Sequence, residues 1–513
     1  MNSQTAAAGM ERGLRVAAAP ADPGREALLE AARGTAEEVE IVGTGSIGQP
    51  TLEPLVLATV DGRTALLPTP GEEAVRAAVD RLAGGDLPES ASYVIEHETE
   101  TKTLPVPDDG PLAVGQRRVT ASCGWLNPLA SEDWDLCSAS ADASEIANLG
   151  IRARGRGDAV ADDSAATAWE QARESDGDPL VVVNAHESDQ RSRADRLLLE
   201  SSPIAVLDGA AAVAGAVGAE RVICYLNEAD DDLREHLRAV VDAATDLPVD
   251  TEIATGPDRY LAGEPTVALE AMEEADRLEP RLQPPGPATH GLYGRPTVLH
   301  TPRTFGQIRA ALATPEVFDT GADDPGTRLV SVTGDVEEPA VVELPTDGSL
   351  AATREAVSVD GRFKMACVGG ALGGLTRDLS VPPSAPALRS ASLGTNGVVE
   401  LFSDRRCPLA VAGERVQFAA EENSGRCVPG REGTVQLTGL LRDIYDGTIE
   451  TEKLRELGRV MERSANCQIG AQAPRPALTA VEEFSSEIRA HADGRCPSGA
   501  CEVTTSGFHG ESV

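Results

Sequence analysis

The chain has 513 residues, which is long enough for about three to four domains. Asp and Glu number 83 against 45 Lys and Arg, giving a formal net charge of -38, and nucleic acid is therefore excluded as an expected partner, because binding to it depends on neutralising phosphates with basic groups. The acidic residues are dispersed along the chain without forming a long tail. This pattern is typical of a solvated surface in a protein from a halophile, where high salt screens self-repulsion.

No targeting or membrane segment is expected from the sequence. Residues 1–20 contain no apolar run of signal-peptide length, and no stretch approaches the roughly 20 apolar residues of a membrane helix. The nine cysteines are odd in number and scattered, so they predict no disulfide framework and agree with a reducing compartment. We therefore expect a cytoplasmic protein without membrane insertion, in which any membrane association is peripheral and made through partners.

The first 90 residues predict a compact α/β unit. Hydrophobic periodicity predicts two helices and two strands. In chain order they cover residues 24–33 (helix), 39–42 (strand), 55–59 (strand) and 72–83 (helix). The polar stretch 96–109, with Pro105 and Pro107, predicts a linker.

The middle of the chain alternates strand and helix patterns, which favours a parallel sheet covered by helices. The segments are 179–184, 205–215, 221–226, 232–245 and 265–277. A hairpin is predicted over residues 328–344, and residues 417–461 are expected to be mostly helical.

A loop at residues 421–434 carries a family resemblance. It reads Glu-Glu-Asn-Ser-Gly-Arg-Cys-Val-Pro-Gly-Arg-Glu-Gly-Thr, and it resembles the Cys-Gly-Lys-Cys-Thr-Pro-Cys-Arg-Glu-Gly segment of the NADH-binding F subunit (51 kDa type) of NADH:quinone oxidoreductase, complex I. The related subunit of NAD(P)-reducing hydrogenases has the same segment. Ser424 and Gly430 stand where the first and third thiolates belong, and Cys427 remains.

Three further segments in the family order support this resemblance. They read Tyr-Leu-Ala-Gly-Glu-Pro-Thr at 260–266, Pro-Arg-Leu-Gln-Pro-Pro-Gly-Pro-Ala at 280–288 and Gly-Leu-Tyr-Gly-Arg-Pro-Thr-Val at 291–298. The family has Tyr-Ile-x-Gly-Glu-Glu-Thr, Pro-Arg-x-Lys-Pro-Pro-Phe-Pro and Gly-Leu-x-Gly-x-Pro-Thr. The resemblance covers roughly residues 40 to 503.

The resemblance implies a multidomain α/β protein. Its expected parts are a thioredoxin-like domain lacking the cluster cysteines (1–95), a linker and entry segment (96–135), and a Rossmann-like FMN- and NADH-binding-type core (136–325). A β-grasp, SLBB-like module (326–400), a helical iron-sulfur-type domain (401–490) and a tail (491–513) would follow.

The resemblance also implies cofactor residues. For FMN they are Arg154 and Gly155 in the glycine-containing loop, Asn184, Glu187 and Ser188 after a core strand, and Tyr260, Gly263 and Glu264. For a [4Fe-4S] cluster, Cys427 and Cys467 match family ligands. No catalytic residue is assigned.

Several family positions carry other residues. Pro265 replaces a glutamate used for NADH, and Gly286 replaces the phenylalanine that stacks on adenine, a contact worth about 1 to 3 kcal/mol by analogy with bases on aromatics. Asp158 would place a carboxylate beside the phosphate. The segment 299–304 lacks both flavin-contacting asparagines. NAD(H) binding is therefore not expected in the family manner.

The cluster sites are depleted too. Ser46 and Pro50 replace both cysteines of the family's Gly-Cys-x-Gly-x-Cys segment, so no [2Fe-2S] cluster is predicted. Two thiolates of four do not complete a [4Fe-4S] site, unless Cys407 or a partner chain supplies ligands.

The tail at 495–501 resembles the family's Cys-Pro-Ala-Gly-x-Cys ending. Without a second cysteine pair or a nearby histidine cluster, the sequence favours ordinary thiols at Cys496 and Cys501 over a metal site.

Three hypotheses follow. The leading one is a relative of the NADH dehydrogenase flavoprotein subunit that acts with other subunits of a redox complex and has degenerate NADH and [4Fe-4S] sites. The second is a working FMN oxidoreductase with a different electron donor. The third is a non-catalytic scaffold or binding subunit.

Overall fold

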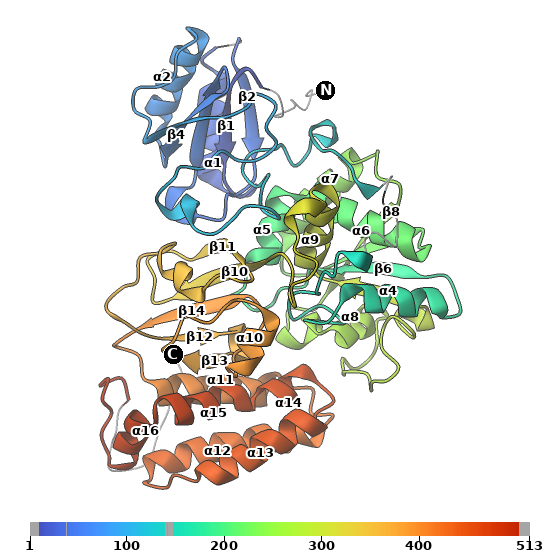
Figure 1. Ribbon diagram of the computed structural model, residues 1–513, viewed down its shortest axis with the longest axis vertical. Helices are drawn as coiled ribbons and strands as arrows, with labels where there is room; N and C mark the ends of the chain where they lie inside the picture. The colour runs from blue at the N-terminus through green and yellow to red at the C-terminus, as the bar shows by residue number, and fades with distance from the viewer. Residues whose placement is uncertain (1–9, 37, 139–140, 142–146, 502–513) are drawn as a thin grey trace.

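The computed structural model describes residues 10–36, 38–138, 141 and 147–501. Figure 1 shows a blue N-terminal sheet, a green α/β region beside it, an orange sheet below, and a layer of orange and red helices at the bottom. The molecule is thus a mixed α/β protein with several sheets, as the sequence predicts.

The N-terminal sheet has the strand order β2-β1-β3-β4-β5. Its elements are β1 (Arg12–Ala17), α1 (Pro23–Arg33), β2 (Glu40–Thr44), β3 (Leu55–Val60), β4 (Arg63–Pro68), α2 (Glu72–Ala83) and β5 (Tyr93–Glu96). β1 runs parallel to β2 and antiparallel to β3. The two predicted helices and two predicted strands are confirmed, and β1, β4 and β5 were not predicted.

The second sheet is wholly parallel, with the order β8-β7-β6-β9. Its strands are β6 (Leu180–Asn184), β7 (Arg221–Asn227), β8 (Asp250–Gly256) and β9 (Thr297–His300), and its helices are α4 (Ala165–Glu174), α5 (Ala194–Ser201), α6 (Pro203–Val217), α7 (Asp231–Ala243), α8 (Pro265–Met272) and α9 (Pro302–Ala313). The predicted alternation is confirmed.

The two faces of this sheet have separate apolar cores. Val181 and Val183 of β6 point to the same core as Phe305 of α9, whereas Leu180 and Val182 pack with α8 on the opposite face. This follows from the alternation of side chains along a strand. The chain reverses its direction across the sheet between β6 and β9, and such reversal points are where open α/β sheets bind ligands.

The third sheet is mixed, with the order β11-β10-β14-β12-β13. Its elements are β10 (Thr327–Gly334), β11 (Ala340–Pro345), β12 (Phe363–Val368), β13 (Gly374–Thr376), α10 (Ala385–Ser390) and β14 (Val398–Ser403). β10 and β11 pair antiparallel, so the predicted hairpin is confirmed.

The C-terminal part is helical, as predicted. It contains α11 (Pro408–Glu422), α12 (Thr434–Tyr445), α13 (Thr451–Ser464), α14 (Gln468–Gln472), α15 (Pro474–Glu483) and α16 (Ser485–Ala492), and a π-helical turn (Pro429–Gly433) precedes α12. Short 3₁₀ turns lie at Pro50–Leu52, Pro111–Ala113, Ser131–Asp133, Tyr260–Gly263, Leu292–Gly294, Pro315–Val317, Leu350–Arg354 and Gly370–Leu372.

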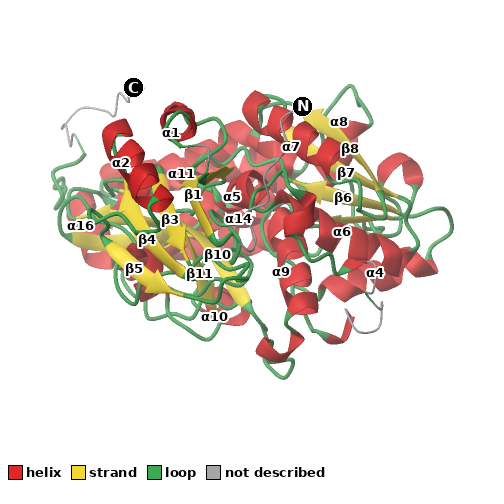
Figure 2. Ribbon diagram, turned by 90° about the horizontal axis from the view of Figure 1, so that it is seen from above, coloured by secondary structure: helices red, strands yellow, loops and turns green. Residues whose placement is uncertain are grey.

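Seen from above, the strands β1, β3, β4 and β5 lie on the opposite side of the molecule from β6, β7 and β8 (Figure 2). Among the described helices, no single one is long and apolar enough to cross a membrane, and one sharply bent pair, α5 with α6, passes that test by length and composition together.

Glu343 of β11 fastens the segment before the α/β core to the third sheet. Its buried carboxylate accepts hydrogen bonds from the backbone amides of Arg118, Val119 and Thr120, each at 3.0 Å, and from the Thr327 hydroxyl at 2.6 Å. Replacing Glu343 with alanine leaves these buried donors without an acceptor. We expect Glu343→Ala to lower the free energy of unfolding by about 3 kcal/mol, measured by urea denaturation.

The exposed Glu338 on the same hairpin provides the control. Glu338→Ala is expected to change the free energy of unfolding by less than about 0.5 kcal/mol. An equal effect of the two substitutions would contradict the anchoring role of Glu343.

Candidate functional site

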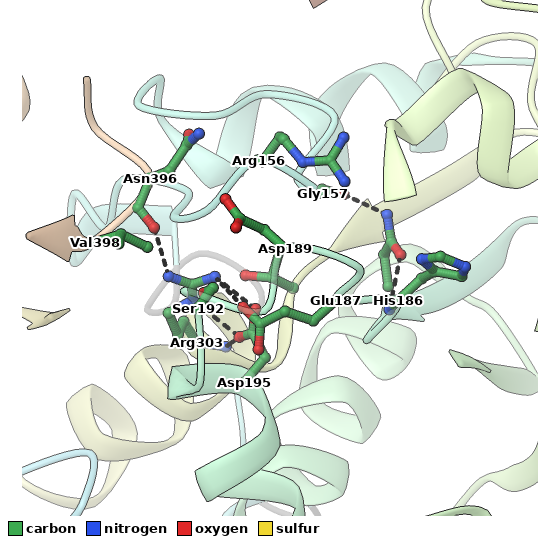
Figure 3. Close-up of a pocket in the computed structure, with 12 residues that line it drawn as sticks. Arg156, Gly157, His186, Glu187, Asp189, Ser192, Asp195, Arg303, Asn396 and Val398 are labelled. Atoms are coloured by element: carbon green, nitrogen blue, oxygen red, sulfur yellow. Dashed lines mark hydrogen bonds and ion pairs between the residues drawn. The ribbon is translucent and has the colours of Figure 1, made fainter. Parts of the chain in front are cut away.

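Some of the residues expected to hold a flavin, Asn184 and Glu187 among them, meet at the reversal point of the parallel sheet. Asn184 is the last residue of β6, and His300 is the last residue of the neighbouring β9. Because parallel strands end at the same edge, the loops that follow them converge there. Figure 3 shows this place with the side chains that line it.

Asn184 is buried and its amide is fully engaged by the protein. Its Nδ2 donates to the carbonyl oxygens of Gly157 at 2.8 Å and Gly263 at 3.1 Å, and its Oδ1 accepts from the His186 amide. The glycine-containing loop therefore lies directly on the end of β6. Both donors of the amide are committed to backbone carbonyls.

Arg303, in the first turn of α9, is the centre of the site. Its Nε donates to Asp195 Oδ1 at 3.0 Å and its Nη2 to Asp195 Oδ2 at 2.6 Å, which is a bidentate pair. The Nη2 also lies 3.4 Å from Glu187 Oε1, and Nη1 donates to the Asn396 carbonyl at 2.8 Å. Figure 3 shows the guanidinium between these groups.

The guanidinium of Arg303 also covers the glycine turn. Gly155 has a φ of +88°, and a Cβ added there would lie 3.0 Å from Arg303 Nη2. At Gly397, which precedes β14, a Cβ would lie 2.9 Å from Nη1. The bare backbone that a phosphate would approach in a glycine-rich turn is thus in contact with an arginine of the same chain.

The remaining cavity at this place is small. Its volume is about 30 Å³, whereas small-molecule sites commonly measure about 300–1,000 Å³.

Two acids share the cation of Arg303. Asp195 and Glu187 are both largely buried, and burial together with the charge of Asp195 raises the pKa of Glu187 to about 7. The same two carboxylates help to raise the pKa of Arg303 against its burial. The three side chains therefore form one charge-coupled group inside the protein.

Asp158, which the resemblance places beside a phosphate, is bound by other side chains of the protein. Both its oxygens lie 2.9 Å from Nδ1 of His300, and Thr304 Oγ1 donates to it at 2.8 Å. Trp169 Nε1 donates to Nε2 of the same histidine at 3.0 Å. Nδ1 of His300 is therefore the donor to Asp158, and this buried chain joins α4, β9 and α9.

Tyr260, Gly263 and Glu264 precede or begin α8. Glu264 caps this helix, because its Oε2 accepts from the Val267 amide at 3.0 Å. Arg156 covers the Tyr260 ring at 3.9 Å from its centroid and donates to the Tyr260 carbonyl at 2.7 Å. Of these three predicted residues, Gly263 contacts Asn184 through its carbonyl oxygen, whereas Tyr260 and Glu264 contact other protein groups.

Arg154 and Ser188 lie outside the lining of the small cavity. Arg154 pairs with Asp324 at 2.5 Å in a fully buried bridge next to Arg328, and burial lowers the pKa of Arg154 to about 10. Ser188 donates to the Arg259 carbonyl at 3.0 Å.

We expect the folded protein to lose stability in acid because His186 is buried. Desolvation lowers its pKa to about 4 from a usual value of 6.5, since its ring stacks on Tyr225 and Nε2 contacts the Pro257 carbonyl. The unfolded chain then binds a proton at higher pH than the folded chain. The contribution of the neutral His186 to the free energy of unfolding is fully present above pH of about 6.5. It falls by up to about 3 kcal/mol as the pH drops toward about 4.

We expect His186→Gln to weaken this pH dependence, measured as the difference in the free energy of unfolding between pH of about 7.5 and about 4.5. The exposed His290 supplies the matched control, and His290→Gln should retain the parent's dependence. If both variants lose stability in acid as the parent does, burial of His186 is not the cause.

A second, larger cavity shares Arg156 and Asn396 with the first. It measures about 490 Å³, and its wall includes Arg156, Glu264, Gln283, Arg475 and the thiol residue Cys467. Its lining among the described residues contains no aromatic ring.

Cys427 and Cys467 are brought together, as their family positions imply. Their sulfur atoms are 3.7 Å apart, and each accepts from a backbone amide, that of Gly430 or Gly470, at 3.3 Å. A Cβ added at Gly430 would lie 3.3 Å from one sulfur and 3.5 Å from the other. The position of the missing third thiolate thus faces the two that remain.

Sequence reasoning missed one group of residues. Cys407, His491, Cys496 and Cys501 place their ligand atoms within 4.8 Å of one another. The sequence favours ordinary thiols at Cys496 and Cys501, whereas the structure places Cys407 and His491 beside them. The regular spacing of His491, Cys496 and Cys501 was a local signal, whereas Cys407 is distant in sequence.

Comparisons with known proteins agree with the fold. The Nuo51 FMN-binding domain matches residues 146–309, and the NADH-ubiquinone oxidoreductase-F iron-sulfur binding region matches residues 410–491. The chain is 28% identical to the NADP-reducing hydrogenase subunit HndC of Solidesulfovibrio fructosivorans, over 75% of this chain and 85% of that protein. It is 29% identical to the F subunit of NADH-quinone oxidoreductase from Streptomyces coelicolor, over 64% and 79%.

A solved structure has a similar fold across nearly the whole chain. A chain of an NAD+-reducing [NiFe]-hydrogenase in the H2-reduced state aligns with a TM-score of 0.65 and 25% identity, covering 94% of this chain and 85% of that chain. Fold and matched regions together define a flavoprotein-type subunit of the kind found in redox complexes. Two regions of the chain therefore match family models of the NADH dehydrogenase flavoprotein (F) subunit, and the chain is similar to F subunits of complex I and to subunits of NAD(P)-reducing hydrogenases.

Proposed function

We propose that this chain is a subunit of a redox complex in which the FMN site of the family has been closed by Arg303. The observation that carries this proposal is the guanidinium against Gly155, held by Asp195 and Glu187. A cavity of about 30 Å³ does not admit a flavin. The residues present therefore do not fit FMN in the family manner.

The geometry also argues against a simple opening of the site. Moving Arg303 away would leave Asp195 and Glu187 as two buried carboxylates without a cation, at a cost of several kcal/mol. Asn184 would have to release two backbone carbonyls as well. A flavin phosphate brings further negative charge, which adds repulsion to this cost.

The nucleotide and cluster sites support the same proposal. Pro265 starts α8 where the family has a glutamate, and the larger cavity offers no ring for stacking on adenine. Cys427 and Cys467 supply two thiolates, whereas a [4Fe-4S] cluster in most proteins takes four. We propose that FMN, NAD(H) and the [4Fe-4S] cluster are not held in the family manner.

The proposed role is structural within the complex. We assign the thioredoxin-like fold to 1–95, a linker and entry segment to 96–135, the Rossmann-like core to 136–325, the β-grasp module to 326–400, the iron-sulfur-type helical domain to 401–490 and the tail to 491–513. Support for partners comes from the relatives, which are named as subunits. A cytoplasmic location remains part of the proposal.

Isolation of the tagged chain from its own cells tests this role. We expect it to elute with other subunits of a hydrogenase-type or complex I-type assembly, and the separated chain to lack NADH-dependent dye reduction. A chain that elutes alone as a monomer, or one that reduces dyes with NADH after separation, would refute the proposal.

A further inference from the structure

We propose that Cys407, His491, Cys496 and Cys501 form a structural zinc site that fastens the C-terminal segment to the helical region. The four ligand atoms all lie within 4.8 Å of one another, and Cys407 Sγ is 3.3 Å from His491 Nε2. A tetrahedral zinc with Zn–S bonds of about 2.3 Å places its ligand atoms roughly 3.5–3.8 Å apart. Small side-chain adjustments bring the observed set to this geometry.

The ligand types favour zinc. Three thiolates and one imidazole form one of the common sets of structural zinc sites, in which all four positions are taken by protein and none is left open for chemistry. One ion is also favoured over an iron-sulfur cluster, because the ligands of a cluster bind separate irons and must stand farther apart than these four atoms do.

The imidazole of His491 is oriented to bind zinc. Its Nδ1 donates to the Glu487 carbonyl at 2.7 Å, one turn earlier in α16. This bond fixes the tautomer in which Nε2 carries the lone pair, and Nε2 is the atom that faces the three sulfurs. A metal-bound histidine in proteins is commonly held in this way by a backbone carbonyl.

The ligands come from three segments. Cys407 precedes α11, His491 lies in the last turn of α16, and Cys496 and Cys501 flank a loop that turns at Gly499 with a φ of +67°. The loop also touches the third sheet, because Lys364 Nζ donates to Ser498 Oγ at 2.8 Å. An ion here ties the loop to both helices, which explains how a segment with few apolar residues is ordered.

The site is separate from the flavin position and from Cys427 and Cys467, so it does not depend on the function proposed above. Metal analysis of the full chain, reconstituted with zinc under reducing conditions, tests it. We expect about one zinc per chain in the parent and at least about tenfold weaker zinc binding in Cys496→Ser and Cys501→Ser.

Cys137→Ser, which changes a half-buried cysteine elsewhere, should keep the parent's zinc. A chelator should lower the thermal midpoint of the parent and of Cys137→Ser, but not that of Cys501→Ser. A parent that binds no stoichiometric zinc, iron with sulfide in place of zinc, or full zinc retention by both tail variants would overturn the assignment.

Discussion

Arg303→Met is expected to lower the free energy of unfolding by about 3–5 kcal/mol, because removing one partner of a buried ion pair leaves uncompensated charge. Here the charge is that of two carboxylates, Asp195 and Glu187, which share the guanidinium. Methionine retains much of the side-chain volume, so the loss reports mainly the missing cation. Urea denaturation at neutral pH measures it.

A compensating variant separates charge from packing. Adding Asp195→Asn and Glu187→Gln to Arg303→Met removes the orphaned charges, and at least half of the lost stability should return. Arg389, whose side chain is 54% exposed in its pair with Asp162, is the matched control. Arg389→Met should cost less than about 1 kcal/mol. Equal losses of stability on replacing the two arginines would contradict the proposal that Arg303 fills the flavin position as a buried cation.

Restoring the two missing thiols is expected to rebuild a cluster site. Gly430 lies in a helical turn with no positive φ, and its added Cβ points to within 3.5 Å of the sulfurs of Cys427 and Cys467. Ser424→Cys with Gly430→Cys then provides four thiolates at the family spacing. After anaerobic reconstitution we expect about four irons and four sulfides per chain, against almost none in the parent.

The double variant Ser424→Ala with Gly430→Ala changes the same positions without adding thiols. It should bind no more iron than the parent, which distinguishes cluster assembly from adventitious iron. Failure of the four-thiolate variant to exceed this control would mean that the loop no longer keeps the family geometry.

Sequence reasoning worked best where the pattern was long and periodic. The predicted helix over residues 72–83 has the bounds of α2, and the alternation from 179 onward matches the parallel sheet. The short strands β1 and β4 begin with the charged residues Arg12 and Arg63 and were missed. Their strand character depends on pairing with β3, which no local pattern reveals.

The candidate site was only partly predictable. The family motifs located Asn184, Glu187, Gly263 and Glu264, and these residues do gather at the reversal point of the sheet. The part played by Arg303 was not foreseen, because it depends on Asp195, which lies 108 residues away in the chain. Long-range ion pairs of this kind leave no periodic signal in a single sequence.

The flavin content of the purified chain tests most directly whether Arg303 closes the flavin site. Protein isolated from cells with ample riboflavin is denatured, the released flavin is quantified by fluorescence, and native protein is titrated with FMN. We expect no stoichiometric flavin and no saturable FMN binding, because Arg303 occupies the site. About one FMN per chain, or saturable binding of added FMN, would contradict it.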